Sequence, residues 1–232
     1  MDKRYHYLFF DLDNTFWDVR QNQYNAQKEL FAMYDMGRYF GTFENYLQSY
    51  ASINEKLWIG YRDGKIGQEE LRSGRYVRLL RSVGIDDESL AMRMSDDYLR
   101  IVPSFHALMP YAKEVLGYLY GKGYPMALIT NGFEQVQQDK VRRAGLSDYF
   151  QYVITSEKAG FTKPNAGIFE YALQKAGVKN TESVMIGDDS YNDIYGAVKA
   201  GMDTVYFNPA GEKHELHPTY EIRTLAELKD IF

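Results

Sequence analysis

The chain of 232 residues contains no cysteine, which excludes disulfide bonds, thiol nucleophiles and cysteine metal sites. It also has no hydrophobic run of membrane-spanning length. Only six uncharged residues separate Arg4 from Asp11, too few for the apolar part of a secretory signal. The formal net charge of −5 gives no reason to expect a nucleic-acid polymer as partner. We therefore expect a cytoplasmic protein that binds neither membranes nor nucleic-acid polymers.

The remaining composition is that of an ordinary globular protein, with 45% hydrophobic and 25% charged residues. A chain of this length can bury a sizeable core, either as one domain or as a domain that carries an insertion. An unusual feature is the number of tyrosines, which is 21. The sequence gives no indication of the oligomeric state.

From about residue 104 onward, short apolar runs alternate with helical patterns. The predicted strands are Tyr124–Ile129, Tyr152–Ile154, Val184–Ile186 and Thr204–Phe207. The predicted helices are Val115–Tyr120, Glu134–Ala144, Ile168–Ala176 and Asp193–Ala200. Such alternation is typical of an α/β fold with a parallel sheet, which Tyr5–Phe10 would join as a further strand.

Residues 18–103 have a different pattern, with apolar residues at helical spacing and no obvious strand. Helices are predicted over Asn25–Met36, Thr42–Trp58, Gly67–Val83 and Asp87–Ile101. We therefore expect residues 1–17 and 104–232 to form the α/β core. Residues 18–103 would be an all-helical domain of four or five helices, inserted after the first strand.

The first predicted strand ends in two acids, Asp11 and Asp13. Alternate residues of a strand point to the same side, so the two carboxylates are expected to face the same way. Like charges at that distance repel each other, and a fold tolerates them when a cation compensates or when the pair does chemistry.

Polar clusters follow the other predicted strands as well. They are Thr130-Asn131-Gly132, Gly187-Asp188-Asp189 with the nearby Asp193, and Lys163 in the loop after Tyr152–Ile154. In an open parallel sheet, ligands bind beyond the carboxyl ends of the strands. The four clusters are therefore expected to meet at one edge of the sheet.

Phosphoryl transfer through an aspartyl-phosphate requires such a set. Asp11, the backbone carbonyl of Asp13, and Asp188 supply the hard oxygen ligands that suit Mg²⁺. Lys163 adds a second positive charge that attracts an anionic phosphate. Asp13 is placed to protonate the leaving oxygen and later to deprotonate a water. Phosphate contacts are expected from Thr130, Asn131, Gly132 and Lys163.

These motifs, in this order, resemble the four motifs of the haloacid dehalogenase superfamily. They are Asp11-x-Asp13-x-Thr15, Thr130-Asn131-Gly132, Lys163-Pro164 and Gly187-Asp188-x-x-x-x-Asp193. The resemblance implies a Rossmann-like core with an inserted helical cap. It also implies that Asp11 is the nucleophile, Asp13 the acid/base and Asp188 the metal ligand, with Thr130 and Lys163 as catalytic phosphate clamps.

Two acids compete for the last role that the resemblance implies. Asp193 matches the second acid of the fourth motif, which binds metal through water or orients Lys163 in relatives. Asp189 is the rival, because some relatives use adjacent acids.

The reaction follows from Asp13, since the dehalogenases of this superfamily lack that second acid. We expect hydrolysis of a small phosphorylated metabolite. The alternatives are a sugar phosphomutase of the β-phosphoglucomutase type and a phosphate-binding module without turnover. Mutases of this cap type usually carry a histidine early in the cap, and residues 18–103 contain none.

The helical cap would select the substrate. The segment from Asn54 to Trp58, followed by Tyr61 and Glu69 to Arg72, resembles the cap of pyrimidine-nucleotidase-like members. A nucleoside 5′-monophosphate is therefore the expected substrate, and cap tyrosines could stack on its base. Alternatively, these aromatic residues pack the cap interior.

Overall fold

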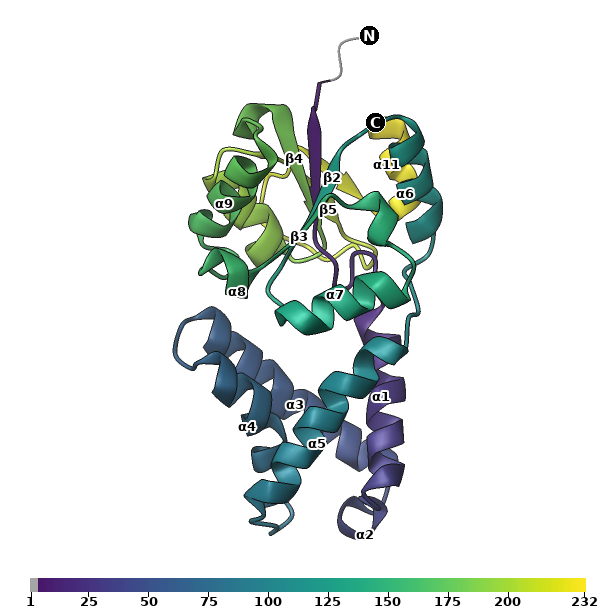
Figure 1. Cartoon of the computed structure of the whole chain (residues 1–232), viewed down its shortest axis with the longest axis vertical. Helices are drawn as coiled ribbons and strands as arrows, with labels where there is room; N and C mark the ends of the chain where they lie inside the picture. Colours follow the sequence, from purple (N-terminus) through teal and green to yellow (C-terminus); the bar gives the residue numbers. More distant parts are fainter. Residues whose placement is uncertain (1–3) are drawn as a thin grey trace. The chain divides into compact units, whose positions relative to one another are not determined.

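A computed structural model describes residues 4–232, and they divide into two compact units (Figure 1). One unit contains the residues up to Val19 together with His106–Phe232. The other unit contains Arg20–Phe105. The boundaries expected from the sequence, after residues 17 and 103, each lie two residues earlier. The first unit is called the core unit below, and the second is called the cap unit.

Within residues 4–232, six parallel strands form one sheet in the order β3-β2-β1-β4-β5-β6. The strands are β1 Tyr7–Phe10, β2 Met126–Thr130, β3 Tyr152–Thr155, β4 Ser183–Gly187, β5 Asp203–Phe207 and β6 Tyr220–Ile222. Phe9 is in register with Ala127 of β2 on one side and with Met185 of β4 on the other. The predicted α/β fold with a parallel sheet is thus confirmed, and β1 lies in its interior.

Helices cover both faces of this sheet (Figure 1). They are α6 Ala112–Gly121, α7 Glu134–Arg143, α8 Ser156–Ala159, α9 Ala166–Ala176, α10 Gly196–Lys199 and α11 Leu228–Ile231. Tyr7 and Phe9 share one face of β1, where they pack with Ile168 and Phe169 of α9. Because both faces of β1 are covered, all four of its residues are buried.

Several elements of the core unit differ from the prediction, and its short helices α8 and α11 were not predicted. The helix expected at Asp193–Ala200 begins earlier, as a π-helix over Ser190–Tyr195 that continues into α10. The edge strand β6, with only three residues, was not predicted. A segment this short is too brief for the alternation of side chains that identifies a strand.

Among the described residues, the cap unit contains five α-helices and a short 3-10 helix over Val102–Ser104. The α-helices are α1 Val19–Met33, α2 Gly37–Phe40, α3 Phe43–Arg62, α4 Gln68–Arg81 and α5 Glu88–Ile101. The side chains of Thr42 and Asp87 accept hydrogen bonds from the first turns of α3 and α5, so both residues are N-caps.

Much of the cap interior is made of tyrosine. Tyr46, Tyr50 and Tyr76 are fully buried, and Gln27 connects two of them. The Tyr46 hydroxyl donates to Gln27 Oε1 at 2.8 Å, and Gln27 Nε2 donates to the Tyr76 hydroxyl at 3.0 Å. These tyrosines therefore pack the cap unit, as the second interpretation of the sequence expected.

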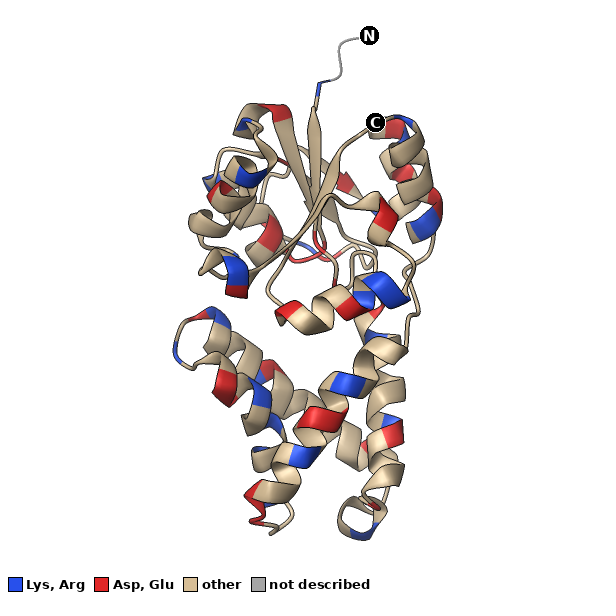
Figure 2. Cartoon of the chain, in the orientation of Figure 1, with Lys and Arg blue, Asp and Glu red and all other residues tan. Residues whose placement is uncertain are grey.

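None of the helices in residues 4–232 combines the length and apolar character that a bilayer crossing requires. Basic and acidic residues are interspersed along the helices of each unit (Figure 2).

Candidate active site

The carboxyl ends of the adjacent strands β2, β1 and β4 carry polar residues. Thr130 is the last residue of β2, Asp11 directly follows β1, and Asp188 directly follows β4. Parallel neighbours end at the same edge of a sheet, so these residues lie close together. The structure thus brings three of the four predicted clusters to one place, and Lys163 of the fourth lies among them.

Lys163 is buried and is surrounded by acceptors. Its Nζ donates to Asp11 Oδ1 at 2.5 Å, to Asp193 Oδ1 at 2.6 Å and to the carbonyl of Ile129 at 2.8 Å. Burial alone would lower the pKa of the Lys163 ammonium, but the two carboxylates hold it above its usual value. Lys163 is therefore a fixed positive charge in contact with the predicted nucleophile.

The loop that carries Lys163 is fastened to the second motif by Asn131. Asn131 Nδ2 donates to the Lys163 carbonyl at 3.0 Å, and Asn131 Oδ1 accepts from the Lys163 backbone N–H at 2.8 Å. Of the predicted phosphate contacts, the Asn131 side chain is thus engaged with the Lys163 backbone. Thr130 Oγ1 accepts from the Gly132 N–H at 3.1 Å.

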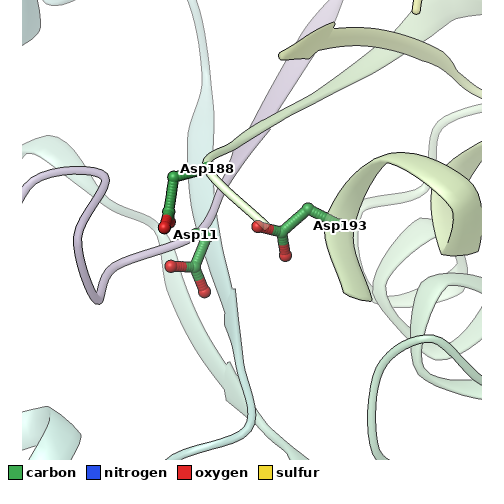
Figure 3. Close-up of side chains that lie close together, drawn as sticks. All are labelled: Asp11, Asp188 and Asp193. Atoms are coloured by element: carbon green, nitrogen blue, oxygen red, sulfur yellow. The ribbon is translucent and has the colours of Figure 1, made fainter. Parts of the chain in front are cut away.

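Asp11, Asp188 and Asp193 form a carboxylate cluster, with one oxygen of each lying within 4.8 Å of the others (Figure 3). Burial raises the pKa of the Asp11 carboxyl, and the nearby acids raise it further against the attraction of Lys163. Burial, together with the charge of Asp193, also raises the pKa of Asp188 to about 8. The cluster therefore favours any cation that relieves this repulsion.

The donor set fits Mg²⁺. One oxygen of Asp11 is used by Lys163, and one oxygen of Asp188 accepts from Thr15 Oγ1 at 3.0 Å. Within residues 4–232, the second oxygen of each carboxylate has no hydrogen-bond donor. Hard carboxylate and carbonyl oxygens are the ligands that Mg²⁺ takes in proteins. Asp11, Asp188 and the carbonyl of Asp13 would hold the ion.

The two candidates for the second acid of the fourth motif have different surroundings. Asp193 is buried against Lys163, and its Oδ2 accepts from the Asp189 N–H at 3.1 Å. Gly187 makes this possible, because a Cβ there would lie 2.2 Å from Asp193 Oδ2. Asp189 instead caps the π-helix by accepting from the backbone N–H groups of Tyr191 and Asn192. The structure thus brings Asp193 into the cluster and leaves the Asp189 carboxylate outside it.

The side chain of Asp13 does not join the carboxylate cluster. Its Oδ1 accepts from Lys140 Nζ at 2.6 Å, and its Oδ2 accepts from Gln137 Nε2 at 2.9 Å. Asp11 and Asp13 therefore have separate cations, where the sequence suggested shared compensation.

Sequence reasoning did not single out Gln137, Lys140 or the contact from Thr15 to Asp188 as parts of the site. The sequence did contain an indication for Gln137 and Lys140. They lie three residues apart on the helix that follows the second motif, so they share one face of it with the apolar Val141. Polar residues on the buried face of a helix require partners, and here the partners belong to the site.

The sheet, the strand-end carboxylates and the buried lysine define an α/β enzyme with a Rossmann-like core. Residues 8–207 match the family model described as haloacid dehalogenase-like hydrolase. The chain belongs to this family, as the resemblance of its four motifs predicted, and it is a hydrolase of the haloacid dehalogenase type.

Several similar proteins match over nearly the whole chain. Pyrimidine 5′-nucleotidase YjjG of Escherichia coli is 29% identical, with 98% of each chain covered. Pyrimidine 5′-nucleotidase PynA of Streptococcus pneumoniae is 30% identical, with 97% of this chain and 94% of PynA covered. A crystal structure of the HAD-hydrolase YfnB of Bacillus subtilis, bound to magnesium, superimposes with a TM-score of 0.89. YfnB is 30% identical in that comparison, with 99% of both chains covered.

Proposed function

We propose that this protein is a Mg²⁺-dependent phosphomonoesterase that works through an aspartyl-phosphate on Asp11. The contact between Asp11 and Lys163 carries the proposal, since it pairs a carboxylate nucleophile with the cation that attracts a phosphate. Bound Mg²⁺ would supply the further positive charge that lets two anions approach each other.

The roles of the remaining residues follow from their positions. A carboxylate oxygen of Asp11 attacks phosphorus while the bond to the leaving oxygen breaks, and Asp13 gives that oxygen its proton. Asp13 then takes a proton from the water that hydrolyses the acyl phosphate. Thr130, with the backbone N–H groups near Asn131 and Gly132, would hold the phosphate oxygens. The proposed reaction therefore needs both Asp11 as nucleophile and Asp13 as acid and base.

We further propose a nucleoside 5′-monophosphate, in particular a pyrimidine nucleotide, as the substrate. The support comes from YjjG and PynA, two pyrimidine 5′-nucleotidases that match this chain almost end to end. Within the cap unit, Trp58 and Tyr61 are half-buried, and their rings pack edge to face with centroids 6.0 Å apart. They are candidates for base stacking, unlike the fully buried tyrosines of the cap interior.

The test of the reaction is phosphate release from nucleoside 5′-monophosphates and sugar phosphates, with Mg²⁺ and with EDTA. The wild-type enzyme should release phosphate in the presence of Mg²⁺ and not in the presence of EDTA. Asp11→Asn should release none in either condition. Activity that persists in purified Asp11→Asn would overturn the covalent mechanism. Isomerisation of a sugar phosphate without phosphate release would instead favour the mutase.

The test of the substrate compares Trp58→Ala with Tyr39→Ala, which removes an exposed cap aromatic. Trp58→Ala should raise KM for pyrimidine nucleotides about tenfold and leave KM for 4-nitrophenyl phosphate nearly unchanged, since a stacked base contributes about 1–3 kcal/mol. The same substrate ranking in both variants would contradict the stacking role.

A further inference from the structure

Helix α7 presents two buried polar side chains to the carboxylate of Asp13. Gln137 and Lys140 are one and seven per cent exposed, respectively, and lie three residues apart on the same helix face. Lys140 Nζ lies 2.6 Å from Asp13 Oδ1, and Gln137 Nε2 lies 2.9 Å from Asp13 Oδ2. Each oxygen of the carboxylate thus has its own donor, which fixes the rotation of the group about its last bond.

Gln137 also contacts the second motif. Its Nε2 donates to Thr130 Oγ1 at 2.5 Å, so one amide group connects Asp13 with Thr130. The space for this amide depends on Gly132, because a Cβ at that position would lie 2.4 Å from Gln137 Cδ. Any larger residue at position 132 would displace the Gln137 side chain. The position of the Gln137 side chain therefore requires glycine at position 132 of the second motif.

Lys140 is held from a second side by Trp17. Its Nζ lies 4.1 Å from the centroid of the Trp17 ring, which is itself buried. A cation over an indole face is attracted by the ring, and burial strengthens the attraction. A buried ammonium also needs a counter-charge, which Asp13 provides. Lys140 is therefore held between the Trp17 ring and the Asp13 carboxylate.

We infer that Gln137 and Lys140 are positioning residues, which hold the Asp13 carboxyl group in the orientation that proton transfer requires. This inference rests on the proposed function, in which Asp13 gives a proton to the leaving oxygen. General acid catalysis depends on the distance and direction between the donor and that oxygen. A carboxyl group free to rotate would be misdirected for most of the time, and a displacement of about 1 Å can reduce the rate about 100-fold.

Leaving-group dependence separates this role from a merely structural one. Benzyl phosphate releases a strongly basic alkoxide, which needs a proton as its bond to phosphorus breaks. 4-Nitrophenyl phosphate releases an anion that the nitro group stabilises and that leaves without a proton. Only the first substrate depends on a well-directed Asp13. Damage to the fold or to phosphate binding would affect both substrates alike.

The experiment measures alcohol release in a single turnover, with enzyme in excess and Mg²⁺ present. Gln137→Met should slow release from benzyl phosphate about 10- to 100-fold and release from 4-nitrophenyl phosphate less than about threefold. Lys140→Met should show the same selectivity, of about tenfold or more. Lys140→Arg keeps a cation above Trp17 and should keep the ratio of the two rates within about threefold of wild type.

Matched controls make the same substitutions at exposed positions of the core unit. They are Gln135→Met on the outer side of α7 and Lys113→Met on α6, and both should behave as wild type. The inference would be overturned if Gln137→Met and Lys140→Met slowed release from both substrates equally or slowed neither. Such a result would leave the proposed function intact. A wild-type enzyme that releases neither alcohol would overturn the proposed function and this inference with it.

Discussion

The core unit and the cap unit each bury a basic side chain, but they surround it differently. Lys163 of the core unit lies against two carboxylates. Arg75 of the cap unit, equally buried, donates to the carbonyl of Leu71 at 2.9 Å and lies over the ring of Tyr98. Lys163 thus belongs to a group of opposed charges, whereas these contacts of Arg75 are with neutral groups.

The difference distinguishes residues that take part in catalysis from residues that only stabilise the fold. Closely packed charges of both signs shift one another's pKa values and change when an ion or an anionic substrate arrives. Buried hydroxyl, amide and ring groups carry no net charge. Their hydrogen bonds therefore stabilise a single arrangement of the packed side chains. We therefore expect changes in the carboxylate cluster or in Lys163 to reduce turnover. Changes in the hydrogen bonds of Gln27 within the cap unit should affect stability alone.

The largest effect should follow from Lys163→Met. The substitution removes the cation that attracts the phosphate, so kcat for 4-nitrophenyl phosphate should fall by about 10²–10³-fold or more. It also leaves Asp11 and Asp193 without a counter-charge, which should lower the free energy of unfolding by about 3–5 kcal/mol. Steady-state kinetics and urea denaturation measure the two effects. A variant with a kcat within tenfold of wild type would contradict the assigned role.

The next effect separates the two rival acids of the fourth motif. Asp193→Asn removes one of the two charges that hold Lys163 and should lower kcat about 10- to 100-fold, as losses of supporting contacts do in enzyme sites. Asp189→Asn should stay within about threefold of wild type, because asparagine caps a helix as well as aspartate does. The two variants control for each other. The opposite order would assign the role to Asp189.

The corresponding change in the cap unit is Gln27→Leu, which leaves the hydroxyls of Tyr46 and Tyr76 without their buried partner. Unsatisfied buried groups cost about 1–3 kcal/mol each, so the loss of both partners should lower the free energy of unfolding by about 2–6 kcal/mol. kcat for 4-nitrophenyl phosphate should change less than about threefold. Gln48→Leu, at an exposed position of α3, is the control. A tenfold loss of kcat in folded Gln27→Leu would remove the distinction between the units.

The last prediction concerns the dependence of stability on pH. Burial raises the pKa of Asp188 from 3.8 to about 8, so the folded metal-free protein binds this proton more tightly than the unfolded chain. The resulting stabilisation is complete below about pH 4 and is lost as the pH rises towards 8. The group contributes a slope of up to about 1.4 kcal/mol per pH unit.

Thermal unfolding in EDTA between pH 4 and 8 tests this dependence, with saturating Mg²⁺ as the comparison. Because Mg²⁺ binds the ionised carboxylates, it should stabilise the protein more at pH 8 than at pH 5. Equal stabilisation by Mg²⁺ at both values would mean that the cluster does not hold the ion.

The local patterns of the sequence were enough to predict five of the six strands of the core unit and its three longest helices, α6, α7 and α9. Buried apolar runs and helical spacing are properties of short segments, so most central strands were predicted within one or two residues. The short strand β6 and the π-helix at Ser190–Tyr195 have no such pattern. Their conformations depend on neighbours, β5 in the first case and the capping Asp189 in the second.

The sequence by itself determined the family and the set of residues at the strand ends, because motif residues and their order are written along the chain. It could not determine which side chains meet. The choice between Asp189 and Asp193, and the contacts of Asp13 with Gln137 and Lys140, join residues up to 127 positions apart. Such contacts arise only when the sheet orders its strands and α7 turns one face towards the site, and only the tertiary structure decides that.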